Sequence, residues 1–223
     1  MNDTTIAIFA RAPVPGRVKT RLIPVLGAEG AARVQSQLME RTIATAHEAA
    51  CGDVVLWCEP SIDHPQFAQC IARHSIRSST QCEGDLGARM HHAASSALES
   101  SGRVVIIGTD CPAFTPQHLI DACVALDKHD AVITPAEDGG YVLLGLKRTD
   151  TRLFEAVNWG SDKVLAQTRE RLRQMRWGWH EMPALWDIDR PEDFARLVQS
   201  GLVPDITQIC AASPHAQPEP AAP

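Results

Sequence analysis

Short apolar runs rich in β-branched residues recur along the chain, separated by longer stretches with the spacing of helices. The runs cover residues 4–10, 53–58, 103–108 and 130–136. Strand-like runs that alternate with helical segments predict a mostly parallel sheet covered by helices. We therefore expect an α/β fold with one domain over residues 1–210.

The intervening stretches show apolar residues on one helical face. In residues 28–50, that face carries Ala32, Leu38, Met39, Ile43 and Ala46, and residues 86–98 and 119–126 are similar. Thr115 followed by Pro116 predicts the start of the last of these helices, because proline is tolerated at the first helical position. These three segments are expected to connect the strands.

The last residues, 211–223, read AASPHAQPEPAAP and hold no large apolar side chain. Such a segment buries too little apolar surface to offset the entropy lost on ordering. We expect a disordered tail rich in proline and alanine.

Composition narrows the function classes. The formal net charge is −6, from 27 acidic and 21 basic residues, whereas general nucleic-acid binders carry a broad basic excess. The seven cysteines form no CxxC pair, which favours reduced thiols in the cytoplasm, and no run has the length of a membrane span or signal segment. We expect no nucleic-acid partner and no membrane partner, and the oligomeric state is left open.

Against this acidic background, one loop is basic. Residues 10–22, ARAPVPGRVKTRL, contain Arg11, Arg17, Lys19 and Arg21, and no acid occurs between Asp3 and Glu29. An extended backbone would point residues 17, 19 and 21 to one side, and Gly16 would let the chain turn under a ligand. A loop after the first strand of an open α/β sheet lies where such folds bind ligands, so we predict an anion site. The alternative is a solvated loop whose arginines meet acids elsewhere.

A candidate metal ligand follows the third apolar run. Asp110 is the only carboxylate between Glu99 and Asp121, and it would lie at the carboxyl edge of the sheet. Mg²⁺ prefers one or two carboxylates together with phosphate oxygens and water. A second carboxylate could come from Glu137, Asp138, Asp187 or Asp189, whereas the structural alternative makes Asp110 a turn residue.

Six segments occur in an order that resembles the uncharacterised DUF2064 family of the nucleotide-diphospho-sugar transferase superfamily. They are FARAPVPGRVKTRL, QCEGDLGARM, IGTDCP, PAEDGGYVLLGL, NWGSDKVL and WDIDRPEDF. KTRL and the late DID…PED are also similar to 2-phospho-lactate guanylyltransferase. The resemblance implies a Rossmann-like GT-A fold, a transferase activity, and Mg²⁺ or Mn²⁺ as cofactor.

The resemblance also assigns roles to individual residues. Catalysis is implied for Arg11, Lys19 and Asp110, and the metal site for Asp110 with Asp189 or Asp187. The nucleotide would contact Arg11, Gly16, Arg17, Lys19, Arg21, Gly84, Asp85, Gly87 and Arg89, and the acceptor would contact Asp138, Gly139, Gly140 and Trp159. From the loop itself, which is free of acids in sequence and indicates no buried pair, Lys19→Ala is expected to weaken nucleotide binding without unfolding the protein.

One position departs from the family pattern. Arg190 stands where relatives have a threonine that caps the following helix, and an arginine cannot accept the orphan N–H bonds there. We expect the helix to survive with Asp189 drawn into capping it.

Three functions are consistent with these features of the sequence. The first is a metal-dependent nucleotidyltransferase that acts on a nucleoside triphosphate and a small phosphorylated acceptor. The second is a glycosyltransferase with a nucleotide-sugar donor, in which Asp138 would serve as base. The third is a nucleotide-binding module without turnover.

Overall fold

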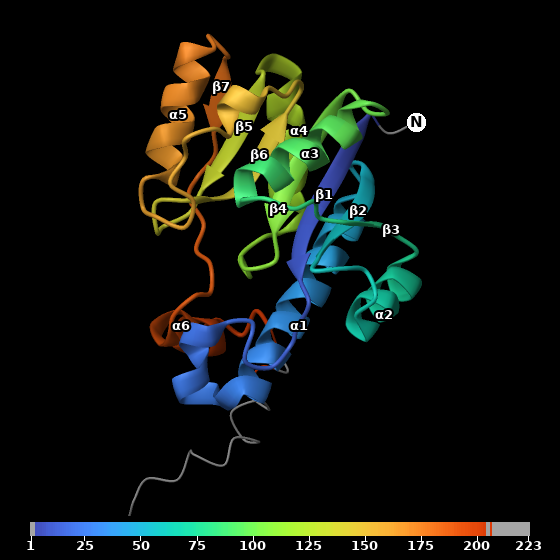
Figure 1. Ribbon diagram of the computed structural model, residues 1–223, viewed down its shortest axis with the longest axis vertical. Coiled ribbons are helices and arrows are strands. Elements are labelled where there is room, and N and C mark those ends of the chain that lie inside the picture. Colours follow the sequence, from blue (N-terminus) through green and yellow to red (C-terminus); the bar gives the residue numbers. More distant parts are fainter. Residues whose placement is uncertain (1–2, 204–205, 207–223) are drawn as a thin grey trace, which may run out of the picture.

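In the computed structural model, which describes residues 3–203 and 206, one seven-stranded sheet organises the chain (Figure 1). The strand order is β3-β2-β1-β4-β6-β5-β7. The strands are β1 (Thr4–Arg11), β2 (Asp53–Glu59), β3 (Arg77–Thr80), β4 (Arg103–Gly108), β5 (Ala131–Pro135), β6 (Tyr141–Leu146) and β7 (Trp179–Glu181).

The predicted sheet is confirmed as mostly parallel. Four strand pairs are parallel, and only β6 runs antiparallel, against both β4 and β5. All four predicted strands are present as β1, β2, β4 and β5, whereas β3, β6 and β7 were not predicted. The result is a Rossmann-like α/β fold whose parallel strands β1 and β4 lie at its centre.

Helices cover both faces of the sheet. They are α1 (Ile23–Ala49), α2 (Pro65–His74), α3 (Leu86–Leu98), α4 (Pro116–Lys128), α5 (Val164–Gln174) and α6 (Pro191–Ser200), with short 3₁₀ turns at Thr20–Leu22 and Thr151–Leu153. The three predicted helices are confirmed as α1, α3 and α4, and the helix that follows Thr115 and Pro116 begins as expected.

The alternation of side chains along β1 explains the two layers. Ile6 and Ile8 pack with the apolar sides of α1, α2 and α4, whereas Ala7 belongs to the cluster that includes α3 and α5. A third cluster joins the first half of α1 to α6 through Leu26, Phe194 and other buried side chains. In Figure 1 this third group lies beyond the ends of β1 and β4.

The predicted tail, residues 211–223, lies outside the described residues. None of the helices in the described part of the chain combines the length and the apolar character that a membrane crossing requires.

A substitution at Gly145 would test how tightly this core is packed. This glycine lies in β6, where an added Cβ would stand 2.4 Å from Val132 Cγ1 and 3.1 Å from Leu126 Cδ1. Because both neighbours belong to a close-packed interior, Gly145→Ala is expected to lower the free energy of unfolding by about 1–3 kcal/mol.

Urea denaturation followed by circular dichroism measures this change. Gly108→Ala is the matched control, since an added Cβ there meets no atom within 4 Å. Equal stability of the two variants would contradict the proposed tight packing around Gly145.

Candidate functional site

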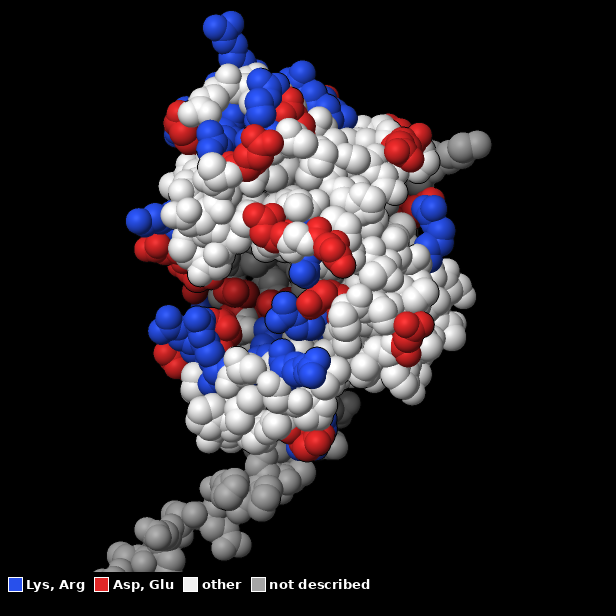
Figure 2. Space-filling view, viewed as in Figure 1, with Lys and Arg blue, Asp and Glu red and all other residues white. Residues whose placement is uncertain are grey.

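A cleft of about 680 Å³ lies at the carboxyl ends of β1 and β4, bordered by residues 17–21 of the basic loop, by Gln35 of α1, and by Asp187 and Asp189 of the connection before α6. Figure 2 shows a hollow at this level of the molecule, with Lys, Arg, Asp and Glu side chains gathered around it. The cleft is lined by many of the residues singled out from the sequence, namely Arg11, Arg17, Lys19, Arg21, Arg89, Asp110, Asp138, Gly140, Trp159, Asp187 and Asp189.

The backbone conformation of the basic loop differs from the predicted one. Its backbone is not extended: Gly16 (φ +78°) and Lys19 (φ +46°) both adopt left-handed conformations, and a 3₁₀ turn begins at Thr20. A lysine with positive φ is uncommon, so surrounding contacts must hold it. Arg17, Lys19 and Arg21 nevertheless line the same cleft, as predicted.

Most of these cations have carboxylate partners from distant segments. Arg11 pairs with Glu59 at the end of β2, and Arg21 pairs with Asp189. The Lys19 ammonium lies 2.6 Å from Asp110 Oδ1, and its side chain is only 6% exposed. The acids that the loop lacks in sequence are therefore supplied in space, and Lys19 is a buried ammonium paired with a half-exposed carboxylate.

Arg17 differs from the other three cations. It is exposed at the cleft and has no carboxylate within ion-pair distance among residues 3–203. A guanidinium in this state can donate to an incoming anion without first breaking an internal ion pair.

Asp110 extends from the end of β4 as predicted. Its side chain is 53% exposed, and its backbone carbonyl accepts from Ile188 N at 2.9 Å. The preceding Thr109 is buried and its hydroxyl is bonded by Gln35 Nε2, from α1, at 3.1 Å. These contacts fix the backbone from which the Asp110 carboxylate reaches the cleft.

Asp187 and Asp189 have different surroundings. Burial, together with repulsion from the neighbouring carboxylates of Asp138 and Asp110, raises the pKa of Asp187 to about 6, whereas Lys19 acts in the opposite direction. Asp189 is instead paired with Arg21. A cation bound between Asp187 and Asp110 would therefore reduce the repulsion between these two carboxylates.

The start of α6 corrects the expected cap. Asp193 accepts hydrogen bonds from the backbone N–H groups of Asp189 (3.0 Å) and Arg190 (2.7 Å), so it fixes the backbone that enters the helix, as the acidic residue of a capping box does. The expectation that the Asp189 side chain caps this helix is wrong. Its carboxylate faces Arg21 across the cleft wall.

The donor set of the cleft fits a divalent cation held partly by a ligand. Within residues 3–203, no group of three or more His, Cys, Asp or Glu side chains is arranged to enclose a metal ion. Asp110 and Asp187 offer two carboxylates that repel each other, which suits a hard cation whose other ligands are phosphate oxygens and water.

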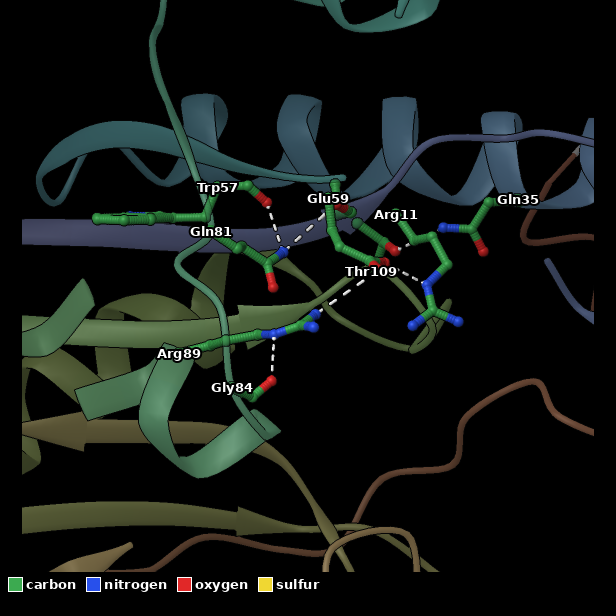
Figure 3. A network of polar contacts seen from close by, with 9 residues as sticks. Arg11, Gln35, Trp57, Glu59, Gln81, Gly84, Arg89 and Thr109 are labelled. Carbon is green, nitrogen blue, oxygen red and sulfur yellow. Dashed lines mark hydrogen bonds and ion pairs between the residues drawn. The ribbon is translucent and has the colours of Figure 1, made fainter. Parts of the chain in front are cut away.

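A second polar network, which includes Arg11, Glu59, Gln81 and Arg89, also lines the cleft. Figure 3 shows Glu59 between Arg11 and Arg89, two cations that come from different elements. Arg89 also donates to the carbonyl of Gly84 at 3.1 Å, and Gln81 Nε2 donates to Trp57 O at 2.9 Å. These contacts fix the segment before α3 against β2.

Five predicted residues do not line the cleft: Gly16, Gly84, Asp85, Gly87 and Gly139. Asp85 caps α3 by accepting from Ala88 N at 2.8 Å. Gly87 allows close packing, because an added Cβ would stand 2.7 Å from the Trp159 indole nitrogen. At Gly139 (φ +92°) an added Cβ would stand 2.4 Å from Asp162 O. At Asp85, Gly87 and Gly139 the contacts shape the wall of the cleft.

Sequence reasoning overlooked Glu59, Gln81 and Gln35, which all line the cleft. Glu59 carried a usable signal, because it ends a predicted parallel strand and such ends meet at one edge of the sheet. Gln35 carried none, since its amide is one polar position on a long helix. It is 4% exposed, so helical periodicity alone would have assigned it to the core or the surface without a partner.

The fold is shared with several solved structures. A candidate nucleotide-diphospho-sugar transferase from Desulfovibrio desulfuricans G20 is 27% identical, with a TM-score of 0.84 over 95% of this chain and 98% of that one. CMP:2-keto-3-deoxy-manno-octonic acid synthetase complexed with CTP is 11% identical, with a TM-score of 0.58 over 89% and 98%. Rv0371c of Mycobacterium tuberculosis H37Rv, in complex with manganese, is 16% identical, with a TM-score of 0.54 over 88% and 98%.

The sequence comparisons identify the family. No curated protein sequence matches the chain. The family model described as "Uncharacterized protein conserved in bacteria (DUF2064)" matches residues 42–161, more than half of the 223 residues. With the fold of nucleotide-diphospho-sugar transferases and this match in sequence, the chain belongs to the DUF2064 family.

Proposed function

We propose that this protein transfers a nucleotidyl group from a nucleoside triphosphate to a small phosphorylated acceptor, with Mg²⁺ or Mn²⁺. The observation that carries the proposal is the convergence of the basic loop and the carboxylates Asp110 and Asp187 on one cleft. A volume of about 680 Å³ suits a nucleotide-sized ligand.

The basic loop provides the phosphate contacts in this proposal. Arg17 is free of carboxylate partners within the described chain, and Arg21 and Lys19 would exchange their internal partners for phosphate oxygens. Such donors stabilise the negative charge that develops on the phosphates during transfer. An acceptor phosphate oxygen would attack the α-phosphorus, and pyrophosphate would leave in line.

Asp110 and Asp187 would hold the divalent cation. When bound, this cation would neutralise phosphate charge and orient the reacting groups. Two solved structures of the same fold support a nucleotide and a divalent cation as ligands, since one is a complex with CTP and another a complex with manganese.

In this proposal, the other residues that line the cleft contact either the nucleotide or the acceptor. Arg89, with Gln81 and the exposed apolar Leu86, would face the base and ribose. Asp138, Gly140 and Trp159 lie on the side of β6 and α5 and would face the acceptor. Asp138 Oδ1 accepts from Gly140 N at 2.9 Å, which fixes the turn that carries it.

Glycosyl transfer from a nucleotide sugar is the second candidate. Asp138 favours it, because this exposed carboxylate lines the cleft without an ion-pair partner in residues 3–203 and could take the proton of an acceptor hydroxyl. The name of the Desulfovibrio structure also points in this direction. The basic loop ranks nucleotidyl transfer first, since its cations suit three phosphates.

The product distinguishes the two reactions. Incubation with Mg²⁺, nucleoside triphosphates and a pool of phosphorylated acceptors is expected to release pyrophosphate, and Asp110→Asn provides the blank. A glycosyltransferase would release a nucleoside diphosphate from a nucleotide sugar in a parallel assay with hydroxyl acceptors. Metal-dependent release of that diphosphate without pyrophosphate would replace the first proposal by the second.

If neither product forms, a binding measurement separates a silent enzyme from a binding module. A ligand that binds the native state raises its unfolding temperature by mass action. Tight nucleotide binding with no turnover across both acceptor pools would favour the binding module.

The second metal carboxylate is also testable. Asp187→Asn is expected to weaken Mn²⁺ binding in the presence of a nucleotide by at least about tenfold, because the ion loses a charged oxygen ligand. Asp189→Asn is the matched control. It removes the same charge two residues further along the chain, from a carboxylate that is paired with Arg21. Titration of Mn²⁺ followed by electron paramagnetic resonance measures both, and a larger loss in Asp189→Asn would reverse the assignment.

A further inference from the structure

Lys19 holds its ammonium within the wall of the cleft. The ammonium lies 2.6 Å from Asp110 Oδ1 and donates to Ile188 O at 2.5 Å. Its side chain is 6% exposed, and its backbone is held in a left-handed conformation. Two of the three N–H donors of the ammonium are therefore used by the protein itself.

This contact occupies the proposed metal ligand. A divalent cation on Asp110 would come close to the Lys19 ammonium and be repelled by it. The cation must therefore displace Lys19 from the carboxylate, or bind against its charge. Either requirement weakens the binding of the cation alone.

A phosphate can remove this obstacle. Arg17 offers an exposed guanidinium without a carboxylate partner in the described chain, on the loop that carries Lys19. An anion drawn there presents oxygen acceptors to the ammonium, which can exchange Asp110 for a phosphate oxygen. The carboxylate of Asp110 then becomes free for the cation.

We infer that the cleft takes its divalent cation and its polyphosphate as one unit, because Lys19 occupies Asp110 until a phosphate draws the ammonium away. The inference rests on the proposed function and deepens it, since it names the metal–polyphosphate complex as the ligand in place of the free cation. By linkage, each component strengthens the binding of the other by the same factor.

The first test uses Mn²⁺ alone, measured as free ion by electron paramagnetic resonance. Lys19→Met removes the competing ammonium and is expected to tighten Mn²⁺ binding by about fivefold, the upper range for a partly exposed ion pair. Adding Asp110→Asn to this variant should abolish the gain. Lys19→Gln provides the same comparison if methionine impairs folding, which thermal unfolding checks.

A change in local charge alone could also tighten cation binding. Arg17→Met is the matched control, because it removes the same charge from the same loop without a contact to Asp110. Its gain in Mn²⁺ affinity should be clearly smaller than that of Lys19→Met. Equal gains, or no gain in Lys19→Met, would overturn the inference.

The second test uses the preformed complex of Mn²⁺ with ATP or another nucleoside triphosphate, titrated calorimetrically. Lys19→Met should bind this complex more weakly than the parent while it binds Mn²⁺ alone more tightly. Opposite shifts support the inference, whereas parallel shifts overturn it.

The two tests separate the inference from the proposed function. Tight binding of the nucleotide complex with no gain for free Mn²⁺ in Lys19→Met refutes the role of Lys19 and leaves the proposed function standing. In the converse case, Lys19→Met binds free Mn²⁺ more tightly but the parent binds no nucleotide complex. This result refutes the proposed function and the polyphosphate part of the inference, and only the competition between Lys19 and the cation for Asp110 remains.

Discussion

The contact of Lys19 with Asp110 and Ile188 joins three segments that lie far apart in the chain. The basic loop follows β1, Asp110 ends β4, and Ile188 belongs to the connection that leads to α6. The backbone bond from Ile188 N to Asp110 O fastens the same connection to the same strand end. The walls of the cleft are thus defined relative to one another by a few bonds around one ammonium group.

The charge distribution of the cleft follows from this arrangement. Cations and carboxylates both line it, and Arg11, Lys19 and Arg21 are each compensated by a carboxylate of the protein while no ligand is bound. Ion pairs at partly exposed positions contribute little net stability, because solvent screens them and side-chain entropy opposes them. Exchange of these partners for ligand groups therefore costs little, which suits a site that must bind and release charged molecules.

Much of the scaffold could be predicted from local patterns. Buried strands such as β1 and β4 consist of continuous apolar runs, and helix α3 shows an uninterrupted apolar face. The strands β3 and β7 could not be recognised in this way, because they are short, partly exposed and polar in sequence, and neighbouring strands define them. Helix α5 is similarly polar, with four arginine and glutamate residues in VLAQTRERLRQ.

The functional site also has features that local sequence predicts and features that only the folded chain shows. Asp110 and the basic loop could be located from the sequence, because both directly follow apolar strands at the carboxyl edge of the sheet. The burial of Lys19 could not, since its carbonyl partner Ile188 is 169 residues away and only the folded chain brings them together. For the same reason, the choice between Asp187 and Asp189 depends on which neighbours surround each carboxylate.

The cluster that joins α6 to the start of α1 has a consequence for synthesis on the ribosome. Leu22, Leu26 and Leu38 are made early, whereas their partners Ile188, Phe194 and Leu197 are made late. The sheet strands from β1 to β6 can emerge and pair while one wall of the cleft still lacks its apolar cover. The nascent chain therefore exposes the amino-terminal half of α1 until α6 leaves the exit tunnel, and this half of α1 is the surface that a chaperone would shield in the interval.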